Sequence, residues 1–383
     1  MKQTFTYLVA AVLGFLSPSL SSQAQNFNGV FKEVTSQADF TEGYYVIAHQ
    51  KDTHDFIALI GENDKHRGEH KALNNVANGI TTNPELKTVW KIEKTSDGKF
   101  TVRNEQTEKF LAAMGKKNQL TTSTPPYPFT IDKYTPKGDR GHGFSLRPVE
   151  VRPVEESWLA FNENSPVYSF VFSMRNKSNY FTNGTHSPRF FKLVVPFTMS
   201  AVQYATYYGD KTVKLPAGLT ANVGEIDAQK HMLKLTPIGN VVPANTAVII
   251  TGAAGNYTLD VSTEAGSVPA KNDLKGSMTE IPATTVSSAS VAYYAMGYNT
   301  DAQKVSFGLV EGTSIPAGKA YIEISKTAGA APELLGDFLI SSVQHVQRDT
   351  ISATIYDLNG RKVTQPVSGQ LYVRNGKKFI YLR

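Results

Sequence analysis

The chain contains no cysteine among its 383 residues. This absence removes disulfide bonds, thiol nucleophiles and thiolate metal sites together. It also removes the lipid-bearing cysteine that N-terminally lipidated exported proteins require. A protein of this length must therefore gain its stability from hydrophobic cores, and 383 residues leave room for two or three domains.

Amphipathic helical periodicity is scarce, and no apolar run after the N-terminus is long enough for a membrane helix. Short alternating runs, such as Phe100–Val102 and Thr212–Leu215, are separated instead by Gly, Pro, Asn and Asp. The sequence therefore predicts an all-β protein with no membrane-spanning segment.

Charge of one sign is not concentrated anywhere, although 39 Lys and Arg against 33 Asp and Glu give a net charge of +6. Nucleic-acid binding would need a basic stripe with interleaved aromatics, which the chain lacks. A Gly-x-Ser-x-Gly elbow and a Gly-rich phosphate loop are absent as well. The adjacent Glu155 and Glu156 would point to opposite faces of a strand, which does not suit glycosidase chemistry. We therefore expect no nucleic-acid partner and no cofactor, and favour a protein that is not an enzyme.

The segment His66-Arg67-Gly68-Glu69-His70 matches the H-x-x-E-H pattern of inverted zinc peptidases. That chemistry requires both histidines on one face of a rigid helix. The central glycine and the flanking loop residues argue against a helix, so we predict no metal site. His49 and His54 are interpreted as solvated loop residues.

The N-terminus has the three regions of a secretory signal peptide. Lys2 supplies a charged start, Tyr7–Leu16 is almost wholly apolar, and Ser22-Gln23-Ala24 offers small residues for cleavage. We expect residues 1–24 to be removed and the mature chain to begin near Gln25.

A repeated pattern organises the first half of the chain. Each copy contains a glycine followed by an alternating strand, then an aromatic-aliphatic-alanine triplet, then an aromatic-x-aliphatic closing triplet. The opening glycines are Gly43, Gly98 and Gly143; the middle triplets are Phe56–Ala58, Phe110–Ala112 and Trp158–Ala160; the closing triplets are Trp90–Ile92, Phe129–Ile131 and Phe191–Leu193. A unit too small to bury its own face must pack on its copies, so a threefold β repeat predicts a pseudo-symmetric β domain over residues 26–195. Trp90 and Trp158 fall on core positions and are interpreted as structural.

Two further regions follow. Residues 198–332 carry two similar turn-strand segments, Val242–Ile250 and Ile315–Ile324, and are predicted to form a β-sandwich-like domain. Residues 341–383 read as a polar linker, Ser341–Asp349, and a short β tail with Asn-Gly turns at Asn359-Gly360 and Asn375-Gly376.

This tail carries a resemblance. The run Ile355–Val363, then Gly369, Leu371–Val373 and Asn375–Lys378, resembles the C-terminal domains of exported Bacteroidota proteins. The resemblance implies sorting through the type IX secretion system, and hence a secreted protein or one attached to the bacterial cell surface.

The repeat logic of residues 26–195 is similar to β-trefoil modules of the ricin and fascin types. The Gln-x-Trp signature of ricin-type lectins is absent, since the closing triplets are preceded by Val89, Pro128 and Phe190. The resemblance therefore implies a β-trefoil-like fold but does not transfer sugar binding.

Residues 176–189 form the best candidate for a ligand-facing loop, because they combine aromatic rings with polar side chains. The candidate ligand-binding residues are Asn179, Tyr180, Asn183, His186 and Arg189. The leading hypothesis is a non-catalytic protein that binds glycans or host glycoproteins. The alternatives are a protease inhibitor presenting a long loop from Lys109 to Pro128, a hydrolase with an unrecognised site, and a purely structural surface protein.

Overall fold

The computed structural model describes residues 26–51, 55–113, 118–133, 142–149, 157–164, 166–174, 185–227, 232–268, 270–286, 290–299, 304–310, 312–326 and 338–341, and four short strands of the tail. Strands dominate these ranges, in which the helices are one four-residue α-helix, α1 (Ala283–Val286), and two 3-10 turns, η1 (Gln37–Asp39) and η2 (Leu86–Thr88). The predicted all-β class is confirmed. Within the described residues, no helix is long and apolar enough to cross a membrane.

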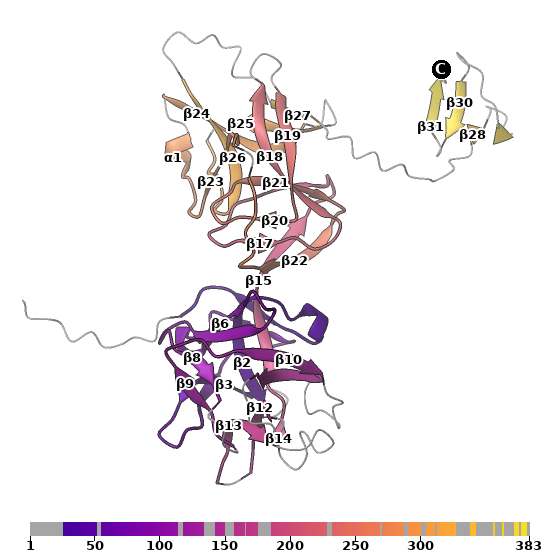
Figure 1. Ribbon diagram of the computed structural model, residues 1–383. Coiled ribbons are helices and arrows are strands. Elements are labelled where there is room, and N and C mark those ends of the chain that lie inside the picture. Colours follow the sequence, from indigo (N-terminus) through magenta and orange to yellow (C-terminus); the bar gives the residue numbers. More distant parts are fainter. Residues whose placement is uncertain are drawn as a thin grey trace, which may run out of the picture. The chain divides into compact units, whose positions relative to one another are not determined.

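The chain forms two compact units, Met1–Leu339 and Ile340–Arg383. The first part of the larger unit is drawn in indigo to magenta in Figure 1. Its strands are β1 (Val30–Glu33), β2 (Gly43–Gln50), β3 (Phe56–Glu62), β4 (Gly68–Leu73), β5 (Ile80–Thr82), β6 (Val89–Lys94), β7 (Phe100–Asn104), β8 (Phe110–Ala112), β9 (Thr121–Ser123), β10 (Phe129–Lys133), β11 (Phe144–Pro148), β12 (Ser157–Asn162), β13 (Ser169–Met174), β14 (Thr185–His186) and β15 (Arg189–Met199).

These strands repeat one pairing pattern. Antiparallel pairing runs from β15 to β2, then to β6, β7, β10 and β11 in succession. Three hairpins, β3–β4, β8–β9 and β12–β13, extend from this series. The hairpins also touch one another, because Gly68 pairs with Phe170 and Gln119 bridges Phe172. Each copy of the sequence repeat therefore contains an opening strand, a hairpin and a closing strand, with β5 added in the first copy and β14 in the third.

The repeat residues take the roles that their chemistry indicates. Gly98 and Gly143 each have φ of 81°, a left-handed conformation that favours glycine at the start of the following strand. The aromatic residues of the closing triplets, Trp90, Phe129 and Phe191, are fully buried. Trp90 Nε1 donates to the Leu59 carbonyl (2.9 Å), and Trp158 is buried beneath the Arg147 guanidinium. The structural role predicted for both tryptophans is thus confirmed.

Strand β2 is buried on both faces and contributes to two cores. Tyr45 and Ile47 enter a cluster with Trp90, Phe129, Phe161 and the other interior residues of the repeats. Val46 and Ala48 point the other way, into a cluster that also includes residues of later strands such as Val213, Leu259 and Val261. A strand buried on both faces reads as a continuous apolar run, which explains the sequence of Tyr44–Ala48.

Strand β15 crosses the predicted boundary at residues 195–198 without interruption. Its first half pairs with β1 and β2, and Val194–Met199 pair with β22 (Gly255–Val261). The remaining strands of this unit are β16 (Tyr204–Tyr207), β17 (Val213–Lys214), β18 (Leu219–Asp227), β19 (Met232–Gly239), β20 (Val241–Val242), β21 (Val248–Gly252), β23 (Leu274–Ser277), β24 (Val291–Asn299), β25 (Lys304–Leu309), β26 (Lys319–Ser325) and β27 (Phe338–Ser341).

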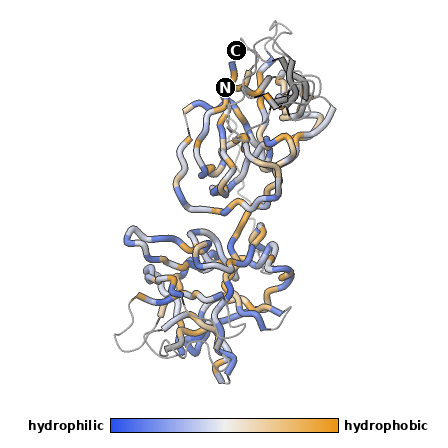
Figure 2. Tube along the Cα trace, turned by 90° about the vertical axis from the view of Figure 1, so that its right-hand side faces the viewer, coloured by the Kyte–Doolittle hydropathy of each residue, from blue (hydrophilic) through white to orange (hydrophobic). Residues whose placement is uncertain are grey.

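The two similar segments of this region make the same turn. Asn245 and Gly318 occupy equivalent places, both have positive φ (58° and 73°), and they precede β21 and β26. Along the described chain, hydrophobic and hydrophilic residues alternate over short distances, as strands with unlike faces require (Figure 2).

The smaller unit contains β28 (Ile355–Tyr356), β29 (Lys362–Val363), β30 (Leu371–Arg374) and β31 (Lys377–Ile380). Arg374 pairs with Lys377, so β30 and β31 pair on either side of the second predicted Asn-Gly turn, whose two residues lie outside the described residues. Tyr356 pairs with Lys362, and the predicted turn at Asn359-Gly360 between them lies outside the described residues. The linker residues 342–349 lie outside the described residues.

Candidate functional site

The predicted ligand-binding residues divide into two groups. Asn179, Tyr180 and Asn183 lie outside the described residues. His186 and Arg189 are described, and each belongs to a separate polar cluster. Both clusters are built from residues that are distant in the sequence.

The first cluster centres on the Glu163 carboxylate. His49 Nε2 donates to Glu163 Oε1 (2.9 Å), and His186 Nε2 lies 3.2 Å from Glu163 Oε2. His49 comes from β2, Glu163 directly follows β12, and His186 ends β14, which pairs with β12 through Phe161. One carboxylate is therefore held between two imidazoles by strand pairing.

His49 is a buried group, not a solvated loop residue as its sequence context indicates. Only 1% of its surface is exposed, and its ring stacks on Phe161 with 4.1 Å between centroids. Burial is the largest cause that lowers the pKa of His49, to about 4, and nearby His186 acts in the same direction. In the neutral imidazole, Nε2 then carries the hydrogen atom and donates a hydrogen bond to the Glu163 carboxylate.

An aromatic group adjoins this cluster. Phe161 meets Tyr168 edge-on at 5.2 Å, and the His70 ring contacts both of them at 5.7 and 5.9 Å. We call the six residues His49, His70, Phe161, Glu163, Tyr168 and His186 the histidine–glutamate edge.

Two members of this edge face solvent on a fixed backbone. Tyr168 is 41% exposed, one of the few large apolar side chains so placed in the described chain, and 34% of the Glu163 side chain is exposed. Tyr168 has φ of 25°, and the preceding turn is held by Arg67, whose Nη1 donates to the Pro166 carbonyl (2.7 Å). A non-glycine residue at positive φ costs free energy that the surrounding structure must supply, so the ring is held outward by the fold.

Arg189 belongs to the second cluster, with Glu33 and His142. Its Nη1 lies 2.8 Å from Glu33 Oε1 and 2.9 Å from His142 Nε2, and His142 Nε2 is 2.7 Å from the same Glu33 oxygen. Burial alone would raise the pKa of Glu33, but the hydrogen bonds from His142 and Arg189 outweigh it and the pKa is lowered. Arg189 is thus engaged in an internal ion pair that joins β1 to β15.

The H-x-x-E-H segment has no helix. His66 lies in a turn with φ of 55°, and Gly68–Leu73 form β4, so the two histidines cannot share a helix face. His66 Nδ1 pairs with Glu62. Among the residues that the structure describes, no group of three or more His, Cys, Asp or Glu is arranged to hold a metal ion.

The prediction of one long loop from Lys109 to Pro128, suggested for protease inhibition, is wrong. Within residues 109–128, Phe110–Ala112 and Thr121–Ser123 pair as the hairpin β8–β9, and Leu111 and Leu120 are fully buried. The hairpin could not be recognised in the sequence, because strands of three residues show too little alternation of apolar and polar residues.

Sequence reasoning missed Glu163 and the burial of His49. Glu163 sits in the Asn-Glu-Asn-Ser run that follows the third aromatic-aliphatic-alanine triplet, which reads as an ordinary turn. The burial of His49 could have been predicted from its position, because side chains two residues apart in a strand share a face and His49 follows the core residues Tyr45 and Ile47 at this spacing.

Neither a protein-family model nor a curated protein sequence matches this chain. Among solved structures, a similar chain is described as "Structure and mode of action of a mosquitocidal holotoxin", with 11% sequence identity and a TM-score of 0.28. The match covers 79% of this chain and 35% of the toxin chain, so this chain spans about a third of that protein. A likeness of this size supports no conclusion about function.

Proposed function

We propose that this protein is a non-catalytic binding protein and that it recognises glycans through the histidine–glutamate edge. The observation that carries the proposal is the exposed ring of Tyr168, held at positive φ and connected through Phe161 and His49 to the partly exposed carboxylate of Glu163. A glycan or a host glycoprotein is the partner.

The chemistry follows from the two exposed groups. An aromatic face offers apolar area to the C–H side of a sugar ring, and the phenol hydroxyl supplies a polar handle. A carboxylate accepts hydrogen bonds from sugar hydroxyls, and these charge-assisted bonds are stronger than neutral ones. Because His49 and His186 hold Glu163 in place, little conformational entropy is lost when a ligand binds.

The proposal extends to the architecture and the location of the protein. Residues 26–195 are proposed to be a β-trefoil, supported by the three equivalent hairpins and the successive strand pairings. Residues 198–332 are proposed to be β-sandwich-like. A signal peptide at residues 1–24 and the sorting-like tail at 341–383 would bring the protein to the outside of the cell or to its surface.

A glycan array probed with residues 25–383 tests the binding role, with Tyr168→Asn and Tyr168→Phe alongside. Asparagine tolerates positive φ, so Tyr168→Asn removes the ring with little backbone strain, and Tyr168→Phe retains it. We expect saturable binding that Tyr168→Asn weakens roughly 3–10-fold and Tyr168→Phe largely keeps.

Met278→Ala is the matched control, since Met278 is 48% exposed and belongs to the later region of the chain. A blank array with folded protein, or equal binding by the wild type and Tyr168→Asn, would overturn the proposal.

The structure bears differently on the two alternative functions. A protease-inhibitor role now lacks the long loop on which that hypothesis depended. A hydrolase stays an alternative, although no hydroxyl group is hydrogen-bonded to an imidazole in the ranges the structure describes.

A further inference from the structure

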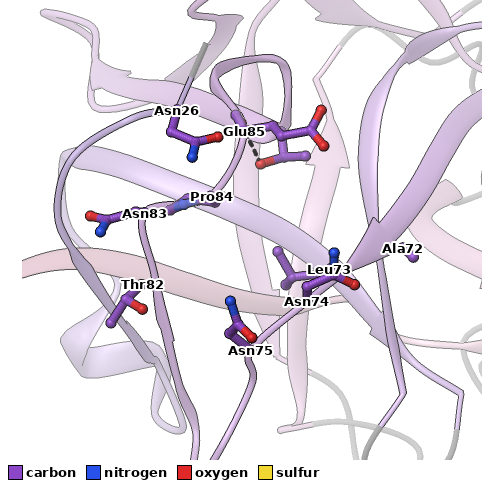
Figure 3. Close-up of a pocket in the computed structure, with 10 residues that line it drawn as sticks. Asn26, Ala72, Leu73, Asn74, Asn75, Thr82, Asn83, Pro84 and Glu85 are labelled. Carbon is purple, nitrogen blue, oxygen red and sulfur yellow. Dashed lines mark hydrogen bonds between the residues drawn. The ribbon is translucent and has the colours of Figure 1, made fainter. Parts of the chain in front are cut away.

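A second feature of the first part of the chain has no role in the proposed function. It is a cavity of about 150 Å³ formed by three segments: Asn26, which lies four residues before the start of β1; the end of β4 with its following loop; and the stretch from β5 to η2. Figure 3 shows Asn26, Asn74, Asn75 and Asn83 around the same space, carried by these separate segments. We call this cavity the amide pocket.

The pocket is held mainly by hydrogen bonds to backbone carbonyls. Phe27 N donates to the Pro84 carbonyl (2.8 Å), and Asn83 N to the Gly29 carbonyl (2.9 Å). Thr81 Oγ1 donates to the Asn74 carbonyl (3.3 Å), and Thr88 Oγ1 to the Glu85 carbonyl (2.7 Å). The walls are therefore formed before any ligand arrives.

Three of the four amides are left available. The Asn83 side chain accepts from Gly29 N (2.9 Å) and is structural. No hydrogen bond to the side-chain amides of Asn26, Asn74 or Asn75 occurs within the described residues. Each amide offers two donors and one acceptor, so the three together match a ligand that carries both kinds of group.

The charge of the lining selects the ligand further. Glu85 is its one charged residue, and Lys71 and Lys87 pair with that carboxylate from outside the lining. The hydrogen bond from Lys71 is the largest cause that lowers the pKa of Glu85. A neutralised carboxylate does not attract a cation, and a lining without arginine or lysine does not attract an anion.

We infer that the amide pocket is a binding site for a small neutral polyhydroxyl compound, such as a single sugar ring. The cavity volume of about 150 Å³ is similar to that of an engineered cavity that holds one benzene molecule, so it suits one six-membered ring and not an extended chain. The site contains none of the residues of the histidine–glutamate edge, so the inference does not depend on the proposed function.

The test uses residues 25–383 labelled selectively with 15N-asparagine. The probes are glucose, galactose, mannose, N-acetylglucosamine and myo-inositol at millimolar concentrations, followed through the side-chain NH2 signals of Asn26, Asn74 and Asn75. We expect at least one probe to shift these signals saturably. Asn75→Gly, which keeps the positive φ of 60° and removes the amide, should weaken that probe roughly 2–10-fold, the loss of about one hydrogen bond.

Asn78→Gly is the matched control, because Asn78 also has positive φ (50°) in the same loop but does not line the pocket. Asn74→Ala provides an independent variant if Asn75→Gly fails to fold. Tyr168→Asn should leave the shifts unchanged, which separates this site from the edge. The inference is overturned if no probe shifts the signals, if neither Asn75→Gly nor Asn74→Ala weakens the shifts, or if calcium or phosphate binds in preference to the neutral probes.

Discussion

The histidine–glutamate edge and the amide pocket present polar groups to solvent in opposite ways. At the edge, titratable side chains are bound to one another and stacked on buried rings, so that Glu163 is fixed by His49 and His186. At the pocket, the backbone supplies most of the frame, and the side-chain amides of Asn74 and Asn75 make no hydrogen bond to any residue that the structure describes. His49 and Phe161 of the edge are buried in the interior, whereas Asn74 and Asn75 of the pocket lie at the surface.

Because the two sites differ in this way, the effect of a substitution on binding can be separated from its effect on stability. A group that supports the fold and faces a ligand cannot be changed without altering both, because its removal leaves buried partners unsatisfied. An exposed amide that bonds to nothing contributes little to the free energy of unfolding. Variants at the two sites should therefore differ in their effect on stability even where both impair binding.

The largest effect is expected from Phe161→Ala. Phe161 is fully buried, stacks on His49 and meets Phe170 edge-on at 5.0 Å. Removal of a buried phenylalanine ring costs about 3–5 kcal/mol through lost contacts and the cavity left behind. Urea unfolding of residues 25–383 should show this loss, and binding at the edge should fall while the asparagine signals of the pocket still respond to sugar.

Phe307→Ala controls for the loss of stability alone, since Phe307 is fully buried in β25, away from both sites in sequence. Under conditions where both variants are folded, Phe307→Ala should keep binding at the edge. If Phe307→Ala impairs this binding as much as Phe161→Ala does, the loss of binding follows from lower stability and not from removal of the Phe161 ring.

A smaller effect is expected from pH. The pKa of His49 is about 4 in the folded protein, against an ordinary value of 6.5, so below pH 6.5 the unfolded chain takes up a proton that the folded chain does not. The free energy of unfolding should therefore fall as pH drops from 6.5 towards 4, by about 2 kcal/mol between pH 7 and pH 5.

His49→Gln keeps a side-chain N–H near Glu163 and removes the titrating ring. Unfolding measured at pH 7 and pH 5 should show a smaller difference for this variant than for the wild type. A wild-type free energy that does not change between these two values would show that His49 is not a buried neutral imidazole.

The repeats explain how much of this architecture the sequence could predict. Alternation and glycine position identify strands such as β7 and β11, because a strand with unlike faces records its burial in the order of its residues. The two sites were not predictable in the same way. Glu163 meets His49 across 114 residues, and the pocket joins Asn26 to Asn75, so both depend on how distant segments meet. The sequence makes Arg189 a candidate ligand-binding residue, since nothing local to it reveals Glu33 as its partner across 156 residues.

The smallest effect is expected from Asn74→Ala. The side chain of Asn74 is exposed and makes no hydrogen bond within the described residues, while its carbonyl, which accepts from Thr81, is unchanged by the substitution. The free energy of unfolding should stay within about 0.5 kcal/mol of the wild type, and its change between pH 7 and pH 5 should match the wild type. Sugar-dependent shifts at Asn26 and Asn75 should nevertheless weaken, because one wall of the pocket has lost its donors and its acceptor. A loss of stability comparable to that of Phe161→Ala would mean that the amide supports the fold after all, and the contrast between the two sites would disappear.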